Sequence, residues 1–166
     1  MTEANRSAAF NALIELHLTE SYRLAAVLLR DRVEAEDATH DAVVRAWDRW
    51  GQLRDRDRFR PWFQQILVNG CRDRLRRRAR GVREIAMPAD FDHALPGRHE
   101  EREQTEIVGA LQRLSPDHQV VVALRYYLDL SVDEIALRTN ARTGTVKSRL
   151  HYALRALRAA YEAQER

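Results

Sequence analysis

Residues 131–150 read SVDEIALRTNARTGTVKSRL, and they predict a short helix, a tight turn and a second helix. Ser131 and Glu134 have the spacing of a capping box, which marks the start of a helix. Asn140 tolerates the left-handed backbone that a tight turn needs, and Val146 and Leu150 then recur at helical spacing. The stretch therefore predicts a helix-turn-helix, a motif whose second helix enters the major groove of DNA.

The second of these helices is basic. Between Arg142 and Ala160 the chain has no acidic residue and five cationic ones, which are Arg142, Lys147, Arg149, Arg155 and Arg158. Such side chains suit contacts with phosphates and base edges. An ordinary helical hairpin with a solvated basic face is the alternative interpretation, but the capping box, the turn and the basic helix agree in register.

The rest of the chain divides at an acidic segment. Residues 81–103 contain two glycines and two prolines without an apolar period, which is typical of a flexible linker. We expect residues 104–166 to form a small helical domain, in which Ser115 and Pro116 start one of the helices. We expect residues 1–80 to form another, with helices over residues 7–29, 33–50 and 61–80.

The composition favours an all-α fold. The 166 residues include only 6 glycines and 4 prolines, and alanine, leucine, arginine and glutamate are abundant. Within residues 33–50 the side opposite the acidic residues carries a stripe of small apolar side chains and one tryptophan: Ala35, Ala38, Ala42, Ala46 and Trp50. We therefore predict two small helical domains joined by a flexible linker, with essentially no sheet.

Several classes of protein are excluded by the sequence. It has no run of about 18 uncharged apolar residues and does not begin like a signal peptide, so we expect a cytoplasmic chain without membrane insertion. A single cysteine, Cys71, cannot form an internal disulfide or a cysteine-based zinc site. Glu36, Asp37, His40 and Asp41 would need a second such motif to hold a metal. We therefore expect no metal, no cofactor and no catalytic site.

A second basic segment follows aromatic residues. The second half of the helix expected over residues 61–80 carries Arg72, Arg74, Arg76, Arg77, Arg78 and Arg80. Trp62 and Phe63 precede it, after a loop that carries Arg54, Arg56 and Phe59. Cations beside aromatic rings suit single-stranded DNA, whose exposed bases need a stacking surface. In the alternative interpretation the aromatic residues are core and the arginines are a solvated helix end.

Taken in order, these segments resemble the extracytoplasmic-function (group IV) sigma factors of the sigma-70 family. RDRVEAEDATHDAVVRAWDRW (30–50) is similar to the family's regions 2.1–2.2, and FRPWFQQILVNGCRDRLRRRAR (59–80) to its regions 2.3–2.4. Residues 111–158, with EIA and GTVKSRL, are similar to region 4.

The resemblance implies three functional surfaces. The region 2.2 helix would bind core RNA polymerase through Asp37, Asp41, Arg45 and Trp47. Regions 2.3–2.4 would melt and capture the −10 element through Asn69, Arg72, Asp73 and Arg76, and the loop over residues 52–60 would pocket a flipped base through Arg54, Arg56 and Phe59. Region 4 would read the −35 element in the major groove through Thr145, Lys147, Ser148, Arg149, His151 and Arg155.

The implied function is that of an alternative sigma factor, which is not itself an enzyme. Its implied partners are bacterial core RNA polymerase, through the β′ clamp helices and the β flap, promoter DNA and an anti-sigma factor. A stand-alone dimeric helix-turn-helix regulator is the alternative function, and a small helical hydrolase is the enzymatic alternative. A further hypothesis is that the acidic linker mimics nucleic acid and keeps the two basic segments apart until polymerase binds.

Overall fold

The computed structural model describes residues 3–81 and 108–164, which form helices and short connections. The helices are α1 (Glu3–Leu29), α2 (Arg32–Arg49), η1 (Trp50–Gln52), η2 (Arg56–Arg58), α3 (Phe59–Gly81), α5 (Pro116–Tyr126), α6 (Val132–Thr139) and α7 (Thr143–Gln164), and residues 108–113 are also helical. No strand occurs in these two ranges, and none of their helices is long and apolar enough to cross a membrane. The all-α prediction is confirmed, whereas the predicted linker lies, beyond Gly81, outside the described residues.

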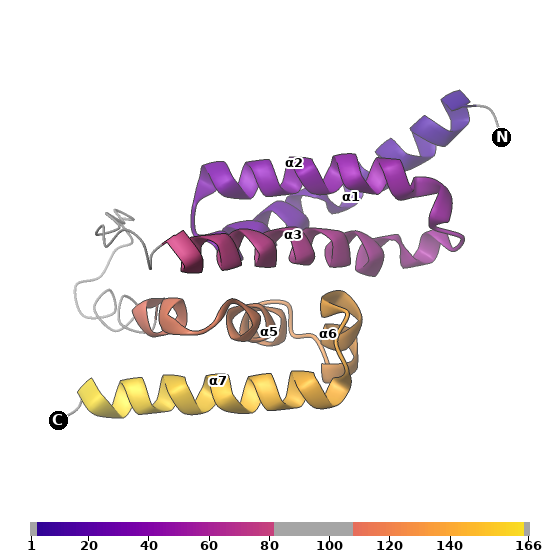
Figure 1. The fold of residues 1–166 in the computed structure, drawn as a ribbon. Coiled ribbons are helices and arrows are strands. Elements are labelled where there is room, and N and C mark those ends of the chain that lie inside the picture. The colour runs from indigo at the N-terminus through magenta and orange to yellow at the C-terminus, as the bar shows by residue number, and fades with distance from the viewer. Residues whose placement is uncertain (1–2, 82–107, 165–166) are drawn as a thin grey trace.

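Helices α1, α2 and α3 pack side by side and form the N-terminal domain (Figure 1). The alanine stripe of α2 is buried as predicted, and Ala35 and Ala46 are fully covered. Because these side chains are short, the neighbouring helices can approach the α2 backbone closely. Leu24 of α1 and Leu67 of α3 are also fully buried in this core, which removes their apolar surface from water.

Two helix starts differ from the predicted ones. Helix α1 begins at Glu3 rather than Ser7, and α3 begins at Phe59 rather than Pro61. Pro61 therefore lies in the first turn of α3, where its missing N–H has no helical partner to lose. Phe59, expected in the loop, belongs to the helix instead.

An aromatic cluster fixes the junction between α2 and α3. Phe10 of α1 meets Trp50 and Phe59 edge-on, with ring centroids 5.3 and 6.2 Å apart. Phe59 in turn stacks on Phe63 at 5.6 Å, and Phe63 is completely buried while Trp62 is half-buried. The interpretation of these aromatic residues as core is therefore right for Phe63, whereas Trp62 keeps part of its surface.

Residues 108–113 and helices α5, α6 and α7 form the C-terminal domain. The Ser115 side chain caps α5, and the capping box at Ser131 is present with both of its hydrogen bonds. Asn140 adopts the predicted left-handed conformation, with φ of 52° and ψ of 40°. Val146 then points inward and is fully buried. The predicted helix-turn-helix is confirmed.

The two domains pack against each other along α3 (Figure 1). Helix α3 contacts α1 and α2 on one side and α5 and α6 on the other. Most buried apolar residues of the two domains form one continuous cluster, whereas Leu114, Val122 and Ala153 form a separate one. In the seam between the domains, Arg138 Nε of α6 donates a 2.8 Å hydrogen bond to Gln64 Oε1 of α3. The two domains are therefore in direct contact, whereas the hypothesis on the acidic linker concerns residues that lie outside the described ranges.

Replacing Ala42 by leucine should destabilise the N-terminal domain. Ala42 is 2% exposed, so a larger side chain needs space that the packed core does not have. We expect the free energy of unfolding, measured by chemical denaturation, to fall by about 1–3 kcal/mol. Leucine is nearly as good a helix former as alanine, so Ala12→Leu on the exposed side of α1 is the matched control. Equal losses in both variants would contradict close packing at Ala42.

Candidate nucleic-acid interface

The outward face of α7 carries most of the residues predicted to read duplex DNA. Val146 and Ala153 point inward and are fully buried, so they anchor the helix from behind. The exposed side chains are polar or cationic, and they are Thr145, Lys147, Ser148, His151 and Arg155. A polar, basic helix supported by the rest of a helix-turn-helix is the geometry that enters a major groove.

Arg149 differs from these five residues. Its side chain is 22% exposed, and Nη2 donates a hydrogen bond of 2.9 Å to Oδ2 of Asp117 in the first turn of α5. A guanidinium that is bonded to a carboxylate is not free for a phosphate or a guanine. In this structure Arg149 is therefore engaged within the protein rather than presented to DNA.

The loop before α3 presents arginines but not its aromatic ring. Arg54 and Arg56 are exposed, and the Arg56 guanidinium lies 5.5 Å from the centroid of the Trp50 ring. Phe59 is 1% exposed, so its side chain has no surface left for contact with a base. The structure places Phe59 as a support beneath the loop, which differs from the predicted role of pocketing a flipped base.

An ion pair fastens the start of α3 to α1. Arg60 Nε donates a hydrogen bond of 3.0 Å to Glu20 Oε2, and Nη2 donates a second one to Oε1. This bidentate geometry is the strong form of an arginine–carboxylate contact. The hydrogen bond from Arg60 lowers the pKa of the Glu20 carboxyl, against the opposing effect of burial.

The residues expected to capture melted DNA lie on α3, and most of them face the other domain. Arg72 Nη2 donates to Asn69 Oδ1 at 2.8 Å, and Nη1 donates to the Thr139 carbonyl of α6 at 3.2 Å. Arg76 Nη2 donates to Asp117 Oδ1 at 3.0 Å. Burial is the main cause that lowers the pKa of Arg72. The C-terminal domain thus occupies part of the predicted −10 surface.

Asp73, whose Oδ1 lies 4.0 Å from Arg76 Nη1, is also close to the residues expected to bind polymerase. It lines a small hollow of about 40 Å³ between α2 and α3, together with Asp41 and Arg45. Asp41 Oδ2 accepts a hydrogen bond of 2.5 Å from Arg74 Nη2.

The predicted polymerase-binding residues lie along α2, and two of them, Asp41 and Arg45, are on its α3 side. Asp37, Asp41 and Arg45 are exposed, whereas Trp47 is half-buried with its ring 5.1 Å from that of Phe10. Figure 1 shows α2 on the opposite side of α3 from the C-terminal domain. This surface therefore stays accessible while the two domains are packed together.

Neither a metal site nor a reactive thiol is found among the described residues. In residues 3–81 and 108–164 no group of three or more His, Cys, Asp or Glu side chains is placed to hold a metal ion. Cys71 is fully buried in α3, and burial raises the pKa of its thiol to about 12. A thiol that is neither exposed nor ionised reacts slowly.

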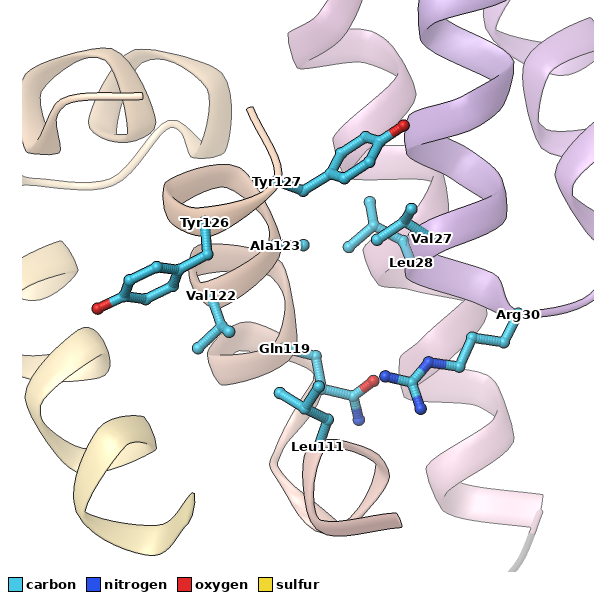
Figure 2. Close-up of a pocket in the computed structure, with 9 residues that line it drawn as sticks. All are labelled: Val27, Leu28, Arg30, Leu111, Gln119, Val122, Ala123, Tyr126 and Tyr127. Carbon is cyan, nitrogen blue, oxygen red and sulfur yellow. The ribbon is translucent and has the colours of Figure 1, made fainter. Parts of the chain in front are cut away.

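A largely apolar hollow of about 270 Å³ lies where α1 meets α5 (Figure 2). Figure 2 shows Tyr127 directed toward the α1 side of the hollow and Tyr126 directed away from it. The remaining residues that line it are Val27, Leu28, Arg30, Leu111, Gln119, Val122 and Ala123. The hollow belongs to the seam between the domains and carries no residue predicted to bind DNA.

Sequence reasoning missed the residues that join the domains. In the sequence, Asp117 can be recognised only as an acidic residue in the first turn of a helix. A negative charge at that position stabilises any helix. Arg138 and Gln64 are 74 positions apart in the sequence, and no local pattern predicts their contact.

Two family models match the chain, in order along its length. The model of Sigma-70 region 2 matches residues 13–81, and the model of Sigma-70, region 4 matches residues 104–157. The first match contains all of α2 and α3, and the second contains α5, α6 and α7 up to residue 157. The two matches thus coincide with the two sets of predicted DNA contacts.

The chain also resembles individual proteins over most of its length. The ECF RNA polymerase sigma factor SigL of Mycobacterium tuberculosis is 34% identical over 167 residues, which cover 93% of this chain and 90% of that protein. The RNA polymerase sigma factor SigV of Bacillus subtilis is 28% identical over 142 residues, covering 86% and 84%. The sigma factor RpoE of Bartonella quintana, solved in complex with the anti-sigma factor NepR, has the same fold, with a TM-score of 0.69 at 23% identity over 92% of this chain and 96% of that one.

The ion pair of Glu20 and Arg60 predicts a pH dependence of stability. The folded-state pKa of Glu20 lies below its ordinary value of 4.5, so the pair contributes fully above that pH. The contribution is lost as the pH falls through the folded-state pKa. Because the pair is partly exposed to solvent, we expect Glu20→Gln to lower the free energy of unfolding by at most about 1 kcal/mol at neutral pH.

The measurement is chemical denaturation of wild type and variant over a pH series. The difference between them should shrink in acid, where the wild-type carboxyl is protonated too. Glu15→Gln, an exposed acid on the same helix, is the control. A loss that is the same at every pH would argue against the ion pair as its cause.

Proposed function

Because this chain belongs to the extracytoplasmic-function sigma factors of the sigma-70 family, we propose that its two helical domains divide the reading of one promoter between them. The chain is an alternative sigma factor, which binds core RNA polymerase and directs promoter-specific initiation. The observation that carries the division of labour is the exposed basic face of α7, in a helix-turn-helix separate from the arginines of α3. Catalysis of RNA synthesis belongs to the polymerase, and this chain is not an enzyme in the proposal.

The C-terminal domain reads the −35 element in this proposal. Lys147 and Arg155 contact phosphates and guanine edges, and Thr145, Ser148 and His151 lie on the same exposed face. Arg149 joins them once it is released from Asp117. Because several cations replace bound counterions, binding of promoter DNA falls steeply as salt rises.

The N-terminal domain captures the melted −10 element in the proposal. Arg54 and Arg56 attract the backbone at the loop, which is supported by the buried ring of Phe59. Asn69, Arg72 and Arg76 contact bases and phosphates along α3 when the C-terminal domain moves away. A flipped base needs a pocket as well as charge, and the half-buried ring of Trp62 offers an apolar surface at the start of α3.

The partners follow from the same arrangement. Asp37, Asp41, Arg45 and Trp47 on α2 contact the β′ clamp helices of core RNA polymerase, and the C-terminal domain contacts the β flap. An anti-sigma factor is a further partner, by analogy with RpoE of Bartonella quintana, which was solved with one. The work of such a protein is cytoplasmic and needs no metal or cofactor.

Gel filtration with bacterial core RNA polymerase, followed by transcription of genomic DNA fragments in vitro, tests this function. We expect the chain to co-elute with the polymerase and to give transcripts that depend on it. The transcript starts would also reveal the promoter sequence. Failure to co-elute, together with tight binding of the chain alone to duplex DNA, would favour a stand-alone dimeric regulator instead.

Two variants should separate DNA reading from polymerase binding. Lys147→Ala should weaken promoter binding and so reduce promoter-specific transcription. If the side chain contacts a base, the binding free energy should fall by about 1–3 kcal/mol. If it contacts a phosphate, the slope of binding affinity against salt should fall by about 1. Co-elution with polymerase should not change. Asp37→Arg should do the reverse, because it reverses a charge on the α2 surface.

The controls alter the same kinds of charge elsewhere. Arg113→Ala removes an exposed cation of the C-terminal domain outside α7, and Glu15→Arg reverses an exposed acid on α1. Transcription and co-elution are measured for all four variants. If Lys147→Ala lost polymerase binding and Asp37→Arg kept it, the assigned surfaces would be reversed.

A further inference from the structure

One carboxylate in the seam contacts arginines from both domains. Asp117, in the first turn of α5, accepts a hydrogen bond of 2.9 Å from Arg149 of α7 and one of 3.0 Å from Arg76 of α3. Arg72 Nε lies 3.9 Å from the same carboxylate. Asp117 is 25% exposed, so these contacts are partly shielded from solvent.

The arginines around Asp117 belong to both proposed DNA surfaces. Arg72 and Arg76 are assigned to the −10 element, and Arg149 is assigned to the −35 element. A carboxylate and a phosphate both accept paired hydrogen bonds from a guanidinium. In the packed arrangement the Asp117 carboxylate therefore accepts hydrogen bonds of the kind that a DNA phosphate accepts from arginine.

The charge of this cluster is not balanced. Asp117 brings one negative charge and Asp73, 4.0 Å from Arg76, brings a second, whereas Arg72, Arg76 and Arg149 bring three positive ones. Nε of Arg72 is buried and finds no hydrogen-bond acceptor among the described residues. A buried donor without an acceptor costs free energy. An additional anion near this cluster would therefore be favourable.

Other polar contacts between the domains cover α3 at the same time. Gln65 Nε2 donates 2.9 Å to the Leu137 carbonyl, and Arg72 Nη1 donates to the Thr139 carbonyl. Both carbonyls belong to α6, which lies against α3 in Figure 1. Melted DNA cannot reach this side of α3 until α6 leaves it.

We propose that Asp117 is an internal competitor of DNA phosphate, which holds the free chain closed and masks arginines of both DNA-reading surfaces. This regulation rests on the proposed function. The exposed α2 surface lets polymerase bind the closed chain, and phosphates of promoter DNA held on the polymerase then take the place of the Asp117 carboxylate.

The experiment compares Asp117→Asn with wild type in the full chain. Asparagine keeps the shape of the side chain and removes its charge. We expect the radius of gyration from small-angle X-ray scattering to rise. We also expect the affinity for a fluorescein-labelled single-stranded DNA of mixed sequence, about 20 nucleotides long, to rise about fivefold, as the loss of one charge-assisted hydrogen bond allows.

Asp129→Asn is the matched control. It removes the same charge from the same domain, and its backbone, with φ of 52°, suits asparagine. Because it lies outside the cluster, it should leave the radius of gyration unchanged and should report how much the lost charge alone raises DNA affinity. An Asp117→Asn chain that matches Asp129→Asn in both measurements would overturn the proposal.

A second variant covers the case in which Asp117→Asn unfolds the C-terminal domain, which circular dichroism would reveal. Gln65→Ala removes a hydrogen bond that exists only between the domains and concerns no assigned DNA contact. It should also raise the radius of gyration and the DNA affinity, by a smaller factor. If neither variant raises the radius of gyration while both still co-elute with polymerase and support transcription, the proposed role of Asp117 is refuted and the sigma-factor function stands.

Discussion

Helix α3 is buried on two opposite sides, and the other helices of both domains pack against these two sides. One side supplies Phe63 and Leu67 to the core with α1 and α2. The other carries Gln64 and Gln65, which contact α6. Between these two sides a polar strip of α3 stays exposed, with Asp73, Arg77 and Arg80 on it. Arginines of its second half that face a neighbouring helix find acceptors on α1, α2, α5 and α6.

The two sides of α3 are held by different chemistry. The side toward α2 is close-packed against alanines, and opening it would expose apolar surface to water. The side toward α6 combines apolar contacts with hydrogen bonds, and Gln64 Nε2 has no partner there among the described residues. Polar contacts can be exchanged for water at a small net cost. Domain interfaces of this mixed kind permit relative motion, whereas the three-helix core does not.

Features that depend on neighbours in sequence could be predicted, and those that depend on packing could not. The capping box at Ser131, the turn at Asn140 and the alanine stripe of α2 each follow from residues a few positions apart. The burial of Phe59 depends on Phe10, which is almost fifty positions away. The capture of Arg149 by Asp117 depends on how α7 crosses α5. The sequence thus indicated which residues have the right chemistry for DNA, but not which of them another side chain already engages.

The position of α2 has a consequence for the search for promoters. A bacterial chromosome offers on the order of a million or more non-specific sites to any protein with free arginines. A free chain that exposed both basic surfaces would bind this DNA non-specifically, and less of it would be available to polymerase. With α5 and α6 covering part of α3 and with α2 exposed on the opposite side, the packed chain presents fewer arginines to this DNA than an open chain would. The proposed closure therefore implies an order of assembly in which the polymerase binds first and the chromosome second.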